Sequence, residues 1–133
     1  MALKVEVSVG ELLDKISILE IKSKRINDSE KLANVEKELA VLRQTWTASS
    51  LSRRDVSSQV ARLRDVNESL WDIEDDIRRK EADRQFDDEF IELARSVYRR
   101  NDERAAVKKE INILFGSELV EEKQYVDYDS TQE

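Results

Sequence analysis

Polar residues interrupt the apolar faces of two segments, and these are the positions where a binding site could form. Between residues 88 and 115 the apolar stripe continues through three hydrogen-bond donors, which are Asn101, Arg104 and Lys108. Burying donors costs free energy unless acceptors face them. The segment 9–26 carries acidic and basic residues among apolar neighbours, namely Asp14, Lys15, Glu20 and Lys22. We expect the two sets to meet.

Two interpretations of this polar seam remain open. The first is a buried or half-buried network of ion pairs that fixes how the helices lie against one another. The second is a pocket between the first and last helices, in which Asn101, Arg104 and Lys108 hold a small anionic ligand. We favour the network. The pocket belongs to an alternative function, a small enzyme that binds an anionic substrate.

Four carboxylates form two pairs at the spacing of one helical turn, which are Asp72 with Asp75 and Glu89 with Glu92. Such pairs on neighbouring helices can hold a hard divalent ion. The all-α nucleoside-triphosphate pyrophosphohydrolases use related ExxE and ExxD motifs, but the order and residue types differ here. Because the chain has 30 acidic residues, chance pairs at this spacing are expected. A metal-dependent nucleotide hydrolase is therefore a further alternative.

Composition removes most other catalytic devices. The chain has no cysteine and no histidine, so Ser-His and Cys-His nucleophiles, thiolate chemistry and ordinary zinc sites are excluded. It also lacks a glycine-rich phosphate loop and a G-x-S-x-G motif. We expect no catalytic residue and no cofactor, and we lean against an enzyme.

The net charge of −7 is concentrated at one end. Residues 117–133 contain six acids and one lysine, so they carry −5 and leave −2 for residues 1–116. No basic stripe with interleaved aromatics is present, which argues against nucleic-acid binding. No apolar run has the length of a membrane span or of a signal peptide, so we expect a soluble, cytoplasmic protein without membrane contact.

The elements that must position the seam are helices, because the chain has no proline and only two glycines. The apolar spacing and the capping residues predict helices over about 9–26, 30–46, 53–84 and 88–115. The first is apolar around much of its circumference and should be central. We predict an all-α, up-down bundle of about four helices over 1–116, with an acidic, partly ordered tail at 117–133.

The two ends of the chain suggest a small addition to the bundle. Residues 3–9 alternate apolar and polar side chains, the period of a half-buried strand. Residues 123–128 could pair with them, which would give a two-stranded edge.

Apolar side chains beyond those of a four-helix core indicate self-association. In the second helix Leu32, Val35, Leu39, Leu42 and Trp46 form a narrow seam of the coiled-coil type. Trp71 flanks the core face of the third helix and could add a dimer contact. The leading hypothesis is therefore a non-catalytic protein-interaction or scaffolding module, acting as a homodimer or with a protein partner.

Three stretches resemble a known family. They are VEVSVGELLDKISILEIKSKRI at 5–26, WDIEDDIR at 71–78 and FIELARSVYRRNDERAAVKKEINILFGSELVEEK at 90–123. Together they are similar to a bacterial and phage family of small, acidic, helical proteins classed only as a domain of unknown function. The resemblance spans nearly the whole chain. It implies a complete single-domain member and no assigned activity, and it covers the segments that carry the polar seam.

Overall fold

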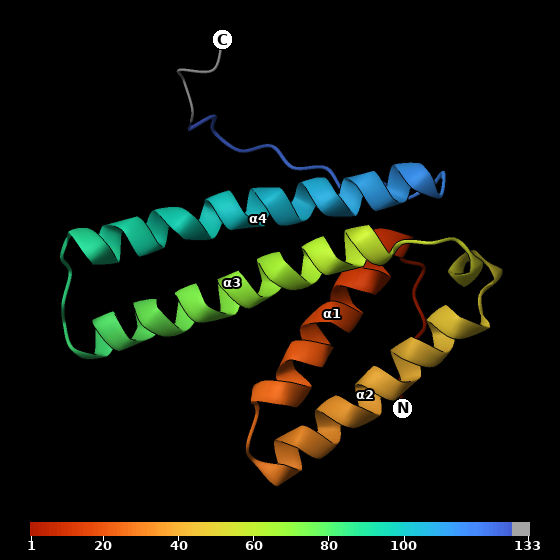
Figure 1. Ribbon diagram of the computed structural model, residues 1–133, viewed down its shortest axis with the longest axis horizontal. Coiled ribbons are helices and arrows are strands. Elements are labelled where there is room, and N and C mark those ends of the chain that lie inside the picture. The colour runs from red at the N-terminus through yellow and green to blue at the C-terminus, as the bar shows by residue number, and fades with distance from the viewer. Residues whose placement is uncertain (129–133) are drawn as a thin grey trace.

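The computed structural model describes residues 1–128 and contains four α-helices in that part of the chain (Figure 1). They are α1 (Val9–Arg25), α2 (Ser29–Ala48), α3 (Ser57–Ala82) and α4 (Asp88–Leu114), with one 3₁₀ turn, η1 (Ser50–Arg53), between α2 and α3. The predicted all-α bundle of four helices is confirmed. The acidic end of the tail, 129–133, lies outside the described residues.

Side-chain caps start three of the helices where the sequence predicts. Ser8, Asp28 and Asp87 each accept a hydrogen bond from the backbone N–H three residues later, at 2.9–3.1 Å. The predicted start of α3 at about Arg53 is wrong: η1 ends there and α3 begins at Ser57. The helix starts late because the Asp55 carboxylate accepts from both the backbone and the hydroxyl of Ser57 and holds a turn.

The helices form two antiparallel hairpins that meet at α1 (Figure 1). Helix α1 packs against α2, α3 and α4, whereas α2 packs against α1 and η1. The expectation that the first helix is central is confirmed. Because α1 touches all three others, a polar residue on almost any of its faces meets another helix.

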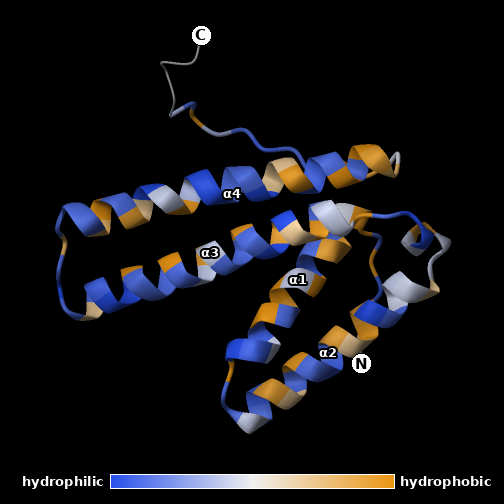
Figure 2. Ribbon diagram, viewed as in Figure 1, coloured by the Kyte–Doolittle hydropathy of each residue, from blue (hydrophilic) through white to orange (hydrophobic). Residues whose placement is uncertain are grey.

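The core lies around α1 and draws on every helix. Its buried apolar members are Leu13, Ile16, Leu19, Val35, Leu39, Val56, Leu63, Val107 and Ile111. Trp46 packs edge-on against Phe115, with ring centroids 6.1 Å apart, and closes one end. Figure 2 shows how α3 and α4 continue past α1 as a more hydrophilic arm. None of the helices in residues 1–128 has the length and apolarity needed to cross a membrane.

The predicted two-stranded edge is not present in the described chain, residues 1–128. The N-terminal segment 1–7 leaves the start of α1, while residues 117–128 run back along α4 on the other side of the molecule (Figure 1). The tail finds its partners on α4 instead. The Tyr128 hydroxyl donates to Asp102 at 2.8 Å, and its ring lies 4.7 Å from that of Tyr98. The two segments are therefore too far apart to pair.

Candidate functional site

The centre of the polar seam is the carboxylate of Asp14, which is fully buried on α1. Arg104 on α4 donates to it through Nε, at 3.0 Å from each oxygen, and through Nη2. Asn67 on α3 donates to Oδ1 from Nδ2 at 2.9 Å and lies 3.3 Å from the Ser17 hydroxyl. The hydrogen bonds to Asp14 raise the pKa of Arg104 above its ordinary value. Three helices are thus joined at one buried acid.

A second cluster forms around Lys108, whose side chain is 9% exposed. Its Nζ lies 2.7 Å from Glu11 at the start of α1 and 2.9 Å from Glu121 in the tail. Burial acts to lower the pKa of Lys108, but the two carboxylates outweigh it and the net pKa is raised. Glu11 also lies 3.6 Å from Lys15, which is exposed. The Glu11 carboxylate therefore pairs with these two lysines, while its backbone N–H donates to the Ser8 hydroxyl that caps α1.

A third contact joins the first turn of α1 to the end of α4. The backbone N–H of Gly10 donates to Oδ1 of the buried Asn112 at 2.8 Å. A β-carbon on Gly10 would lie 2.6 Å from the backbone oxygen of Lys108 and 2.8 Å from that Oδ1. Only a glycine lets the two helices come this close.

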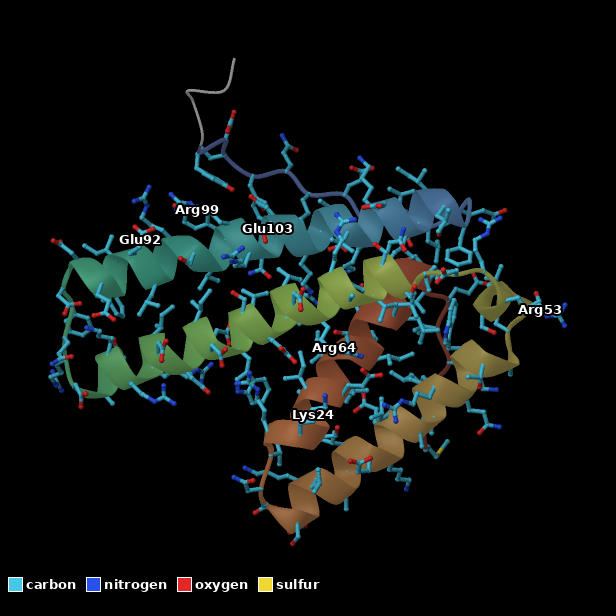
Figure 3. All side chains as sticks on the ribbon, in the orientation of Figure 1. Lys24, Arg53, Arg64, Glu92, Arg99 and Glu103 are labelled. Atoms are coloured by element: carbon cyan, nitrogen blue, oxygen red, sulfur yellow. The ribbon has the colours of Figure 1, made fainter. Side chains whose placement is uncertain are left out.

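The remaining predicted residues lie elsewhere. Glu20 faces away from Asp14 and links three helices through Arg43 at 3.2 Å and Arg64 at 2.7 Å (Figure 3 labels Arg64). Lys22 and Asn101 line a pocket of about 260 Å³ between α1, α3 and α4, together with Arg104. The seven predicted residues therefore divide among several contacts instead of forming one site.

Sequence reasoning missed several residues of these contacts, among them Glu11, Asn67, Asn112 and Glu121. A signal existed for Asn67, because it interrupts an apolar stripe between Leu63 and Leu70 on α3. Glu121 carried none, since it lies in the tail.

All of these buried groups are paired. Within residues 1–128 no buried side-chain nitrogen or oxygen lacks a hydrogen-bond partner. Both oxygens of Asp14 accept hydrogen bonds and neither is exposed to solvent. This carboxylate cannot reach a substrate, so the centre of the seam has the geometry of a structural contact.

The four carboxylates considered as metal ligands, Asp72, Asp75, Glu89 and Glu92, are not brought together. Asp72 pairs with Arg25 at 2.5 Å, Glu89 with Lys80 at 3.1 Å, and Glu92 with Arg95 at 3.2 Å and Arg99 at 3.3 Å. Figure 3 shows Glu92 and Arg99 on the outer surface of α4. Over the described chain no group of three or more acidic residues is placed to hold a metal ion. Three of the four carboxylates are instead paired with neighbouring basic side chains.

The pKa of Glu121 gives a pH test of the tail contact. The hydrogen bond from Lys108 lowers this pKa below the ordinary value of a glutamate. A lowered folded-state pKa means that the contact stabilises the folded chain above the ordinary pKa and is lost as pH falls through the lowered one. An NMR titration of the Glu121 carboxyl should show the depressed midpoint, and Lys108→Met should raise it. An unchanged midpoint in Lys108→Met would contradict the contact.

The chain that forms this all-α arrangement belongs to a defined family. Residues 3–133 match the model described as "Family of unknown function (DUF6165)", and the chain is a member of that family. Neither the comparison with curated proteins nor that with solved structures gave a match.

Proposed function

We propose that this protein is a non-catalytic helical module that assembles as a homodimer through its N-terminal segment. The observation that carries the proposal is the state of residues 1–7. They make no hydrogen bond to any part of the described chain, and their apolar side chains lie in solvent. Leu3 is 94% and Val5 is 75% exposed.

The closed polar seam supports a non-catalytic role. The buried polar groups are already paired with one another. The Asp14 carboxylate, for example, accepts hydrogen bonds from Arg104 and Asn67. A catalytic acid or base needs a free site within hydrogen-bond reach of a substrate. The seam offers no such site at its centre, so its contribution is to hold α1, α3 and α4 in register.

The sequence of the segment suits pairing with a second copy. In an antiparallel ladder centred on Val5, Leu3 of one chain lies opposite Val7 of the other, and Lys4 lies opposite Glu6. Side chains alternate between the two faces of a strand. One face of such a ribbon would carry only apolar residues, and the other would carry two opposite-charge pairs. The two-fold symmetry that this pairing requires is that of the commonest homodimers.

A two-stranded ribbon is marginal in water unless it packs against something else. The end of the bundle from which the segment emerges offers a surface. Gly10 at the start of α1 touches Asn112, and the residues that follow, Ile113 and Leu114, are 72% and 38% exposed. We expect the apolar face of the ribbon to cover these side chains.

Charge reversal tests the register of the ribbon. Lys4→Glu places two acidic side chains opposite each other in both pairs, and Glu6→Lys places two lysines opposite each other. Each variant should therefore dimerise more weakly, by roughly tenfold if each of the two reversed pairs costs about 0.7 kcal/mol. Mixing the two variants restores opposite charges in the heterodimer, as does the double variant. Sedimentation velocity over about a hundredfold range of concentration measures each dimer.

Two results would contradict the proposal. A wild-type chain that stays monomeric at the highest concentration removes the dimer. The antiparallel register centred on Val5 is contradicted if dimerisation is equally strong in the single variants, their mixture and the double variant. Val5→Pro is a second check, because proline removes a backbone N–H and fixes φ at about −65°, away from the φ of an antiparallel strand, and should weaken pairing without touching the helices.

A further inference from the structure

The pocket between α1, α3 and α4 differs from the closed seam beside it. It holds about 260 Å³ and opens to solvent next to the Asp14–Arg104 contact. Three of the polar side chains that line it form no hydrogen bond or ion pair with any described residue: Lys22 on α1, Glu74 on α3 and Asn101 on α4. Lys22 is half-buried and belongs to the lining of the pocket.

Arg104 connects the pocket to the buried acid. Its Nε and Nη2 are committed to Asp14, whereas Nη1 donates to no described residue. The guanidinium is therefore fixed in place by one edge and retains donors on the other. A donor that is already oriented loses little freedom when a ligand binds. With Lys22 and Asn101, three helix positions offer hydrogen-bond donors to one small space.

Apolar side chains form much of the rest of the wall. Ile18, Leu70 and Trp71 line the pocket, and the Arg25 guanidinium lies over the Trp71 ring, 5.8 Å from its centroid. Small-molecule sites combine an apolar lining with a few polar groups that fix orientation. This lining suits a flat hydrocarbon body better than a sugar.

One acidic residue limits the charge of the ligand. Glu74 also lines the pocket, is exposed, and pairs with none of the described cations. A ligand with a single negative group, bound at Lys22 and Arg104, can tolerate the Glu74 carboxylate nearby. A second negative group on the ligand would be repelled by Glu74. Polyanions such as nucleoside triphosphates are disfavoured for this reason.

We infer that this pocket binds a small monocarboxylate with an apolar or aromatic body. The carboxylate accepts from Lys22, Asn101 and the free edge of Arg104, and the body packs on Leu70 and Trp71. The inference is independent of dimerisation, because residues 1–7 do not line the pocket.

Three ligands of similar shape test it by two-dimensional NMR of the full chain. They are benzoate with one carboxylate, benzyl alcohol with none and terephthalate with two. Benzoate should give saturable shifts of the Trp71 indole N–H and the Asn101 side-chain amide, and should bind more tightly than the other two. Lys22→Met should weaken benzoate by about two- to fivefold, the size of one exposed ion pair. Glu74→Gln should tighten terephthalate by a similar factor.

Lys24→Met is the matched control, since Lys24 is an exposed lysine on the same helix that does not line the pocket (Figure 3). It should bind benzoate like the wild type. The inference is overturned if benzoate gives no saturable shift at these two groups. It is also overturned if benzyl alcohol binds equally well, or if Lys22→Met and Lys24→Met behave alike. The same spectra report folding, so a misfolded variant cannot be mistaken for loss of binding.

Discussion

Replacing Arg104 with alanine is expected to lower the free energy of unfolding by about 3–5 kcal/mol, the cost of leaving one partner of a buried ion pair uncompensated. Asp14 is fully buried, and Arg104 supplies three of the four hydrogen bonds that its carboxylate accepts. Asn67 would remain as a donor at 2.9 Å, but a neutral amide cannot offset the charge. Urea unfolding followed by circular dichroism measures the loss as a shift of the midpoint.

The matched control is Arg100→Ala, one turn earlier on α4. Arg100 pairs with Glu103 at 2.9 Å, and both side chains are about half exposed. Exposed pairs of this kind contribute about 0.2–1 kcal/mol, so this variant should unfold close to the wild type. Equal losses in Arg100→Ala and Arg104→Ala would show that the Asp14 contact is not the one that fixes the bundle.

The double variant Asp14→Leu/Arg104→Leu distinguishes the net contribution of the ion pair from the cost of leaving the Asp14 carboxylate unpaired. With both charges removed, no unpaired carboxylate is left buried, so the double variant should be more stable than Arg104→Ala. It should not fully regain wild-type stability, because Asn67 then keeps only the Ser17 hydroxyl at 3.3 Å. A double variant as unstable as the single one would mean that lost packing, not the unpaired acid, sets the cost.

The helices could be predicted because their determinants are local. Caps at Ser8, Asp28 and Asp87 act within three residues, and the apolar spacing repeats within each helix. The central place of α1 also followed from sequence, since apolar residues cover much of its circumference. The strand predicted at the N-terminus is absent from residues 1–7 of the structure. Alternating apolar and polar side chains show that a segment can form a strand, but they do not identify the strand with which it would pair. The tail found Asp102 and Tyr98 on α4 instead.

The polar seam was predicted in part, and helical geometry explains where it divides. At about 100° per residue, Glu20 lies roughly 240° around α1 from Asp14, on another face of the helix. It therefore meets Arg43 and Arg64. Lys22 returns to within about 80° of Asp14 and shares the pocket with Arg104. Pairing across helices needs the crossing geometry as well, and a single sequence does not give it.

Gly10→Ala is the second change with a large expected effect, and its sign is informative. Alanine favours a helix over glycine by about 1 kcal/mol, so in open space this substitution would stabilise α1. Here the new β-carbon would lie 2.6 Å from the backbone oxygen of Lys108, which cannot turn aside as a side chain can. The two helices must separate, and we expect a net loss of about 1–3 kcal/mol, the usual cost of overpacking.

Gly116→Ala provides the comparison, because it is the same chemical change with no atom within 4 Å of the added carbon. Its φ of +62° makes alanine unfavourable there by about 1–2 kcal/mol through the backbone alone. The two losses can be similar in size, so NMR distinguishes them. Gly10→Ala should shift the amide signals of Lys108 and Asn112, whereas Gly116→Ala should leave Lys108 unchanged. A more stable Gly10→Ala chain would show that α1 and α4 do not meet at Gly10. The position of α4 against α1, on which the Asp14–Arg104 contact depends, would then be contradicted at this point.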